Sequence, residues 1–182
     1  MCSSAVKTDA VQIAFATVAL ILAAALQDML PAFGGAKTPL LQMFALYVAF
    51  RWPGRREARD SAGGNIPHAW IWTAVAAGYM LEALSGLPWG CCIAFMLPAC
   101  AVARAIRHVV ADMSPVLLGM TSAILFAPLH EAWLEAWGAT GGGSAFVRFF
   151  ASALPAAAAG AVIFWILPAV EHFAGLGEEA GS

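Results

Sequence analysis

Apolar residues gather in six long runs along the chain, separated by polar and turn-forming residues. The runs cover residues 10–30, 39–52, 68–85, 89–106, 115–134 and 146–170. A helix needs about 20 mostly apolar residues to cross the hydrocarbon core of a bilayer, and it pairs every backbone polar group within its own segment. The pattern therefore predicts an all-α polytopic membrane protein with about six transmembrane helices. Residues 1–174 form a single bundle in this prediction, and residues 175–182 form a disordered tail.

The composition agrees with a chain that lipid covers. Hydrophobic residues make up 62% of the 182 positions and charged residues only 11%, whereas soluble domains carry about 25% charged residues. Cys91 and Cys92 are adjacent in a hydrophobic run, which is typical of small apolar residues in a helix and not of a disulfide frame or a metal site. Basic residues form no run that would indicate a nucleic-acid partner.

The second run differs from the others in its length. Its 14 residues, 39–52, would rise only about 21 Å as a helix, which is short of a full crossing. Thr38 is expected to cap this helix and Pro39 to occupy its first position. Whether the segment crosses is left open, and with it the side on which the N-terminus lies.

The distribution of lysine and arginine indicates the orientation, because these residues collect in short cytoplasmic loops. In a six-helix arrangement, one side carries seven of them: Lys7, Arg51, Arg55, Arg56, Arg59, Arg104 and Arg107. The other side carries Lys37 and Arg148. The C-terminus is therefore expected in the cytoplasm.

Four acidic residues fall within the predicted helices, where such residues are costly and are functional candidates. They are Asp28, Glu82, Glu131 and Glu135, all toward the ends expected to face outward. Two interpretations remain: they line an outward-facing polar vestibule, or they are solvated at the level of the lipid headgroups.

The sequence contains no convincing catalytic or metal-binding set. His130 begins the stretch HEAWLE, which lacks the second histidine of the metalloprotease motif HExxH. We therefore expect no enzyme activity, no cofactor and no metal. The small-residue run 155–161 allows close approach of a neighbouring helix or of a second subunit, so a homodimer stays open.

Two stretches carry a family resemblance. The first, Leu30 to Pro53, contains Pro31, Lys37, Tyr47 and the boundary Arg51 to Pro53. The second, Gly78 to Gly90, contains Gly78, Glu82, Ser85, Gly86, Pro88 and Gly90. Together they resemble MreD, the bacterial rod-shape-determining membrane protein. That family more often has an aspartate at the position of Glu82, and the chain from Met113 onward offers no matching motif.

The resemblance implies a non-enzymatic scaffold of the cell-shape and cell-wall elongation machinery in the bacterial inner membrane. Its expected partners are an MreC-like bitopic protein, MreB-type filaments, cell-wall synthases and membrane lipid. The family fold is similar to the substrate-binding subunits of energy-coupling factor transporters, so a vitamin-like small-solute transporter subunit is the alternative. The candidate partner or vestibule residues are Asp28, Pro31, Tyr47, Glu82, Ser85, Gly86, Pro88, Gly90 and Glu131.

Overall fold

The computed structural model describes residues 2–30, 38–52, 69–110, 112–138 and 145–174. Within these ranges the chain forms six helices and no strand: α1 (Cys2–Met29), α2 (Leu40–Arg51), α4 (Ala69–Ser85), α5 (Cys91–Ile106), α6 (Pro115–Ala136) and α7 (Ala145–Phe173). Each helix coincides with one of the six apolar runs, and the described part of the chain is all-helical, as predicted. The predicted tail 175–182 lies outside the described residues, as does Pro31.

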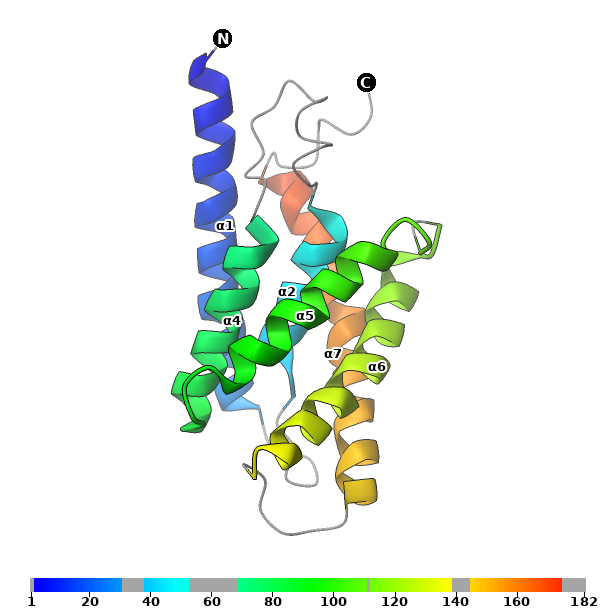
Figure 1. Ribbon diagram of the computed structural model, residues 1–182. Coiled ribbons are helices and arrows are strands. Elements are labelled where there is room, and N and C mark those ends of the chain that lie inside the picture. Colours follow the sequence, from blue (N-terminus) through cyan, green and yellow to red (C-terminus); the bar gives the residue numbers. More distant parts are fainter. Residues whose placement is uncertain (1, 31–37, 53–68, 111, 139–144, 175–182) are drawn as a thin grey trace.

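The helices run alternately up and down between two ends of a bundle (Figure 1). The start of α1 and the end of α7 lie at one end, together with the C-terminal ends of α2 and α5. The C-terminal ends of α1, α4 and α6 lie at the opposite end, and α5 crosses the front of the bundle diagonally. We call the end that holds Arg51, Arg104 and Arg107 the arginine end, and the other the acidic end, where Asp28, Glu82 and Glu131 lie.

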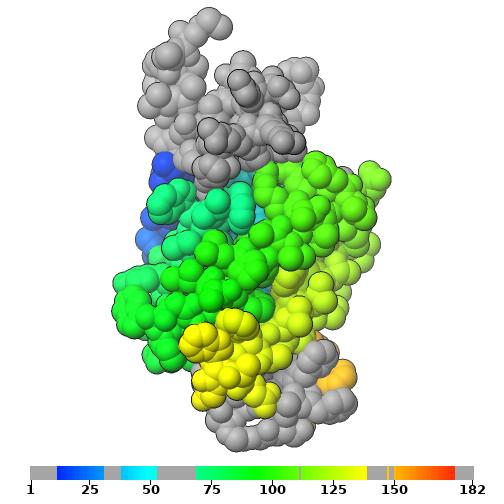
Figure 2. Space-filling view, viewed as in Figure 1, coloured from blue at the N-terminus to red at the C-terminus, as the bar shows by residue number. Residues whose placement is uncertain are grey.

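The short helix α2 lies in the middle of the bundle. Every residue from Leu41 to Phe50 is buried, and in the space-filling view α4, α5 and α6 almost hide it (Figure 2). Twelve residues rise only about 18 Å. Because the other helices enclose α2 on its sides, its length need not match the thickness of a bilayer.

The N-terminus of α2 is capped from another helix. Pro39 is the N-cap residue, and no side chain of α2's own N-cap makes a capping bond. Instead the Leu41 amide donates to Gln27 Oε1 of α1 at 3.1 Å, while Thr38 contributes its backbone carbonyl to Leu40 N. The expectation that Thr38 caps the helix and that Pro39 is its first residue is therefore wrong, because Pro39 itself is the N-cap. Gln27 supplies the acceptor because α1 already lies against this end, where an unpaired buried amide would be costly.

The longest two-helix contact joins α6 and α7, and it depends on two glycines. A Cβ on Gly119 would lie 2.3 Å from the carbonyl oxygen of Gly160, and a Cβ on Gly160 would lie 2.3 Å from that of Gly119. Ala123 of α6 lies at the same crossing, 3.0 Å from a Cβ placed on Gly160. The small-residue run thus serves close packing within the bundle, of the kind seen between transmembrane helices.

Three of the described helices are long and apolar enough to cross a membrane: Gln12–Met29 of α1, Pro115–Ala136 of α6 and Phe150–Phe173 of α7. Large apolar side chains on their outer surfaces are exposed, among them Leu154 and Trp165 of α7 at 80% and 70%. Soluble monomers rarely expose apolar patches of this extent. These features are those of a membrane-embedded protein.

Candidate functional site

The second stretch of the family resemblance folds as a hairpin of α4 and α5, and Glu82 holds it closed. The Glu82 carboxylate accepts backbone N–H bonds from Cys92 and Ile93 at Oε1, at 2.8 and 3.0 Å, and from Gly90 at Oε2, at 2.9 Å. These amides lie at the N-terminus of α5, where the backbone N–H groups have no carbonyl partner within their own helix. A negative group is also favoured there by the helix dipole. Glu82 therefore acts as the cap of α5, supplied by the neighbouring helix.

The glycines of the hairpin allow this geometry. Gly86, directly after α4, and Gly90, directly before α5, have φ angles of 65° and 89°, a region that L side chains rarely adopt. Gly78 lets α4 approach α5 closely, because a Cβ there would lie 2.8 Å from Ile93 Cα. Pro88 completes the turn by accepting the Cys91 amide at its carbonyl.

This placement corrects both interpretations of Glu82, as a residue that lines an open vestibule and as one that is solvated at the level of the headgroups. Its side chain is 3% exposed, and both carboxylate oxygens are engaged with backbone amides. Tyr47 is fully buried in α2 and likewise faces the interior. Neither residue can touch a partner in this conformation.

The other candidates lie nearer the surface. Ser85, Gly86 and Pro88 are exposed on the hairpin turn, and Gly90 is partly exposed. Asp28 is exposed in the last turn of α1, and Glu131 is partly exposed on α6. The structure thus brings together the turn residues as one exposed surface, while Asp28 and Glu131 come from different helices at the acidic end.

A second polar cluster lies at the arginine end. Glu171 of α7 accepts hydrogen bonds from the Tyr47 hydroxyl and from Trp52 Nε1, both at 2.7 Å. Arg104 and Arg107 of α5 donate from Nη1 to the Trp52 carbonyl at 2.8 and 3.2 Å. This cluster ties the C-terminal end of α2 to both α5 and α7. It also satisfies a free carbonyl at the end of a helix, where cations are favoured.

Sequence reasoning did not identify Glu171, although it could have predicted that Tyr47 and Trp52 each need a hydrogen-bond acceptor. A buried tyrosine hydroxyl or indole N–H usually finds a hydrogen-bond partner, and both Tyr47 and Trp52 belong to the short apolar run 39–52. Their acceptor is 124 and 119 residues away in the sequence. No local pattern connects positions so far apart.

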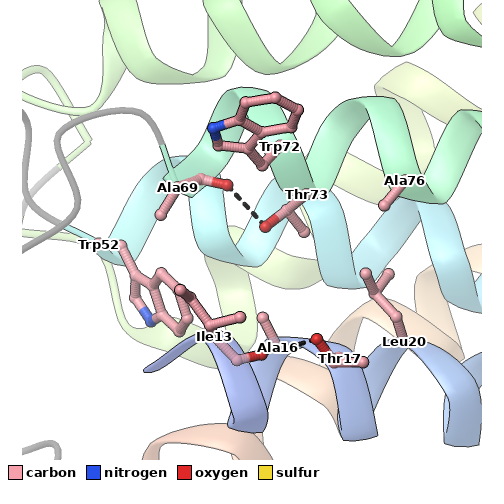
Figure 3. A pocket seen from close by; sticks show the side chains of 9 residues that line it. All are labelled: Ile13, Ala16, Thr17, Leu20, Trp52, Ala69, Trp72, Thr73 and Ala76. Atoms are coloured by element: carbon pink, nitrogen blue, oxygen red, sulfur yellow. Dashed lines mark hydrogen bonds between the residues drawn. The ribbon is translucent and has the colours of Figure 1, made fainter. Parts of the chain in front are cut away.

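An apolar groove opens between α1 and α4 at the arginine end (Figure 3). Its volume is about 350 Å³. The lining residues are Ile13, Ala16, Thr17 and Leu20 of α1, Ala69, Trp72, Thr73 and Ala76 of α4, and Trp52 at one end. The two hydroxyls in the lining point back to their own helices, since Thr17 donates to the Ile13 carbonyl and Thr73 to the Ala69 carbonyl. We call this feature the α1–α4 groove; it presents an almost wholly apolar surface.

The interior also holds a thiol and an imidazole in contact. Cys92 Sγ lies 3.9 Å from His130 Nε2, and the His130 ring packs on Phe95 with centroids 4.9 Å apart. Across the described part of the chain, no group of three or more His, Cys, Asp or Glu side chains is arranged to hold a metal ion. Cys92 and His130 alone are too few ligands for such a site, and we interpret their contact as core packing.

Comparison with family models, with curated proteins and with solved structures gave no match to this chain. The function therefore has to be inferred from the residues of this chain and their geometry.

Proposed function

We propose that this chain is a non-enzymatic, multi-pass scaffold of the bacterial inner membrane that acts in the cell-shape and cell-wall elongation machinery, as MreD-like proteins do. In this proposal it binds an MreC-like bitopic protein and connects it to MreB-type filaments and to peptidoglycan synthases. The sequence resemblance is the origin of the proposal. The geometry adds support of a different kind, which concerns how the interior polar groups are used.

The observation that carries the proposal is that the principal polar side chains inside the described bundle bind the protein itself. Glu82 binds amides of α5, Glu171 binds Tyr47 and Trp52, and Gln42 donates from Nε2 to the Phe126 carbonyl, while its Oε1 has no partner among the described residues. A pocket for a polar solute needs a few convergent polar groups that remain available to the ligand. The α1–α4 groove offers none, because its hydroxyls are satisfied within their own helices. This arrangement favours contacts with apolar partners at the surface over binding of a vitamin-like solute.

The exposed turn between α4 and α5 is the proposed partner surface. To test it, the chain is co-expressed with the MreC-like protein of the same organism, purified in mild detergent, and examined for co-elution at a fixed ratio. Ser85→Arg places a bulky charge on the turn, and Ala136→Arg places the same charge on an exposed residue of α6 at the same end of the bundle. We expect co-elution to survive Ala136→Arg and to fall at least tenfold with Ser85→Arg.

Two results would contradict this function. Equal co-elution of both variants would remove the turn from the interface. Failure of the unmodified chain to bind, together with a small molecule identified in the purified protein by mass spectrometry, would favour the transporter-subunit alternative.

The orientation is part of the proposal. The arginine end carries Arg51, Arg104 and Arg107 together with the end of α7 (Figure 1), so the positive-inside tendency puts the C-terminus in the cytoplasm. The test uses exposed positions at the two ends, His172→Cys and Ala136→Cys, in a chain that also carries Cys2→Ser. A maleimide that cannot cross the membrane should label intact cells only at position 136. Labelling at position 172 alone would reverse the orientation.

A further inference from the structure

The α1–α4 groove faces outward from the bundle, toward the space that lipid fills around a membrane protein. Ile13 and Trp72 are 54% and 70% exposed, and Figure 3 shows them on the two different helices that line the groove. Part of its lining consists of small side chains, those of Ala16, Ala69 and Ala76. The groove is thus a hollow in a lipid-facing surface, built from side chains that do not fill it.

The dimensions of the groove limit what it can hold. A helix with its side chains is about 10–12 Å across. Two turns of such a helix occupy more space than the groove, whose volume is about 350 Å³, provides. A slender, unbranched apolar chain fits such a space. Burying it there would remove apolar surface without stranding a polar group, because the Thr17 and Thr73 hydroxyls are already bonded.

The end of the groove adds a charge preference. Trp52 closes it, and the next residue back, Arg51, is exposed. The guanidinium groups of Arg104 and Arg107 lie at the Trp52 carbonyl, with Glu171 as the acidic residue of the same cluster. Among the described residues of this cluster, three arginines stand beside one carboxylate, and Arg51 approaches the Tyr47 hydroxyl that Glu171 binds. Basic sites between transmembrane helices are suited to anionic lipid headgroups, and tryptophans mark the depth at which headgroups lie.

We propose that the α1–α4 groove binds one acyl chain of an anionic phospholipid, with the phosphate held at the arginine end beside Arg51. The lipid would cover the exposed apolar strip of α1 and α4 and tie it to the C-terminal end of α2. The proposal goes beyond the scaffold function and does not depend on it, since it requires only that the bundle lies in a bilayer.

The test is native mass spectrometry of the full-length protein in mild detergent, with phosphatidylglycerol or phosphatidylcholine of identical acyl chains added in separate titrations. The unmodified protein should retain one phosphatidylglycerol about fivefold more strongly than phosphatidylcholine, the preference expected for one basic residue near a phosphate. Ala76→Phe fills the groove from its wall and should abolish retention of both lipids. Ala158→Phe, at an exposed position of α7 far from the groove, is the matched control and should retain both.

Arg51→Gln separates the headgroup from the acyl chain. It should remove the preference for phosphatidylglycerol and leave the binding of phosphatidylcholine unchanged. Equal retention of the two lipids by the unmodified protein would overturn the role of the arginine end. Unchanged retention by Ala76→Phe would overturn the groove as the site. A dimer that Ala76→Phe converts to a monomer would show that a second copy occupies the groove, and would overturn the lipid proposal.

Discussion

Removing the Glu82 carboxylate should destabilise the bundle more than the loss of an ordinary helix cap. The substitution Glu82→Ala leaves three amides of the first turn of α5 without their acceptor, namely those of Gly90, Cys92 and Ile93. Truncation of an N-cap residue costs about 0.5–2 kcal/mol, mostly at exposed helix ends. Here the acceptor is 3% exposed and Cys92 is fully buried, so the desolvation penalty of unpaired donors, about 1–3 kcal/mol, is added in part. We expect a loss of about 3 kcal/mol in the free energy of unfolding.

Glu82→Gln is the informative second variant. The glutamine can still accept from Cys92 and Ile93 with its one oxygen, but its amide group meets the Gly90 N–H as a second donor. It also loses the charge that favours hydrogen bonds at this helix end. The expected loss is about 1–1.5 kcal/mol, clearly smaller than for alanine.

The assay is reversible unfolding in mixed micelles with increasing denaturing detergent, followed by far-ultraviolet circular dichroism. Ser85→Ala is the matched control, because Ser85 lies in the same turn and its hydroxyl donates only to the Leu81 carbonyl of its own helix; a change within about 0.5 kcal/mol is expected there. The reasoning fails if Glu82→Ala is no more destabilising than Ser85→Ala, or if glutamine costs as much as alanine.

Three further substitutions test the packing and the second cluster by the same assay. Gly119→Ala should cost about 1–3 kcal/mol, because the new Cβ meets the Gly160 carbonyl oxygen at 2.3 Å and a backbone atom cannot move aside as a side chain does; a neutral result would contradict the close crossing of α6 and α7. A double-mutant cycle of Tyr47→Phe and Glu171→Ala should show a coupling of about 1 kcal/mol through their 2.7 Å hydrogen bond, and additive effects would show that the bond contributes nothing. Gln42→Met should change stability by less than about 1 kcal/mol, since Gln42 Oε1 is buried without a partner among the described residues and its removal offsets the lost bond to Phe126; a large loss would mean that Oε1 has an acceptor role that these contacts do not show.

The helices could be predicted from the sequence, and the contacts between them could not. Long apolar runs bounded by proline, glycine and charge indicate where a helix begins and ends. Helix α6 is an example: it starts at Pro115, and the Ser114 hydroxyl caps it by accepting the Leu117 amide. The cap of α2 depends instead on Gln27, which is 14 residues from Leu41 and on another helix. A local pattern carries no information about such a pair until the helices are placed side by side.

The depth of the acidic residues shows the same limit. Their position near helix ends could be read from the sequence, and the structure places Asp28, Glu82 and Glu131 at one end of the bundle (Figure 1). Which of them faces outward depends on the rotation of each helix. Glu82 turns inward because the bare first turn of α5 lies eight to eleven residues ahead of it, and a carboxylate in a bilayer is most stable where amides surround it.

The residues that carry the family resemblance in α4 and α5 thus have structural roles: Gly78 sets the helix spacing, Glu82 caps α5, and Gly86 and Gly90 shape the turn. A motif built from such residues informs chiefly about the fold, and a fold can host several functions. Loss of partner binding in a Glu82 variant would therefore report unfolding as readily as a lost contact. Only substitutions on the exposed turn, such as Ser85→Arg, separate the two, because they add a charge where no interior contact is made. The scaffold proposal consequently stands or falls on that surface and not on the motif that suggested it.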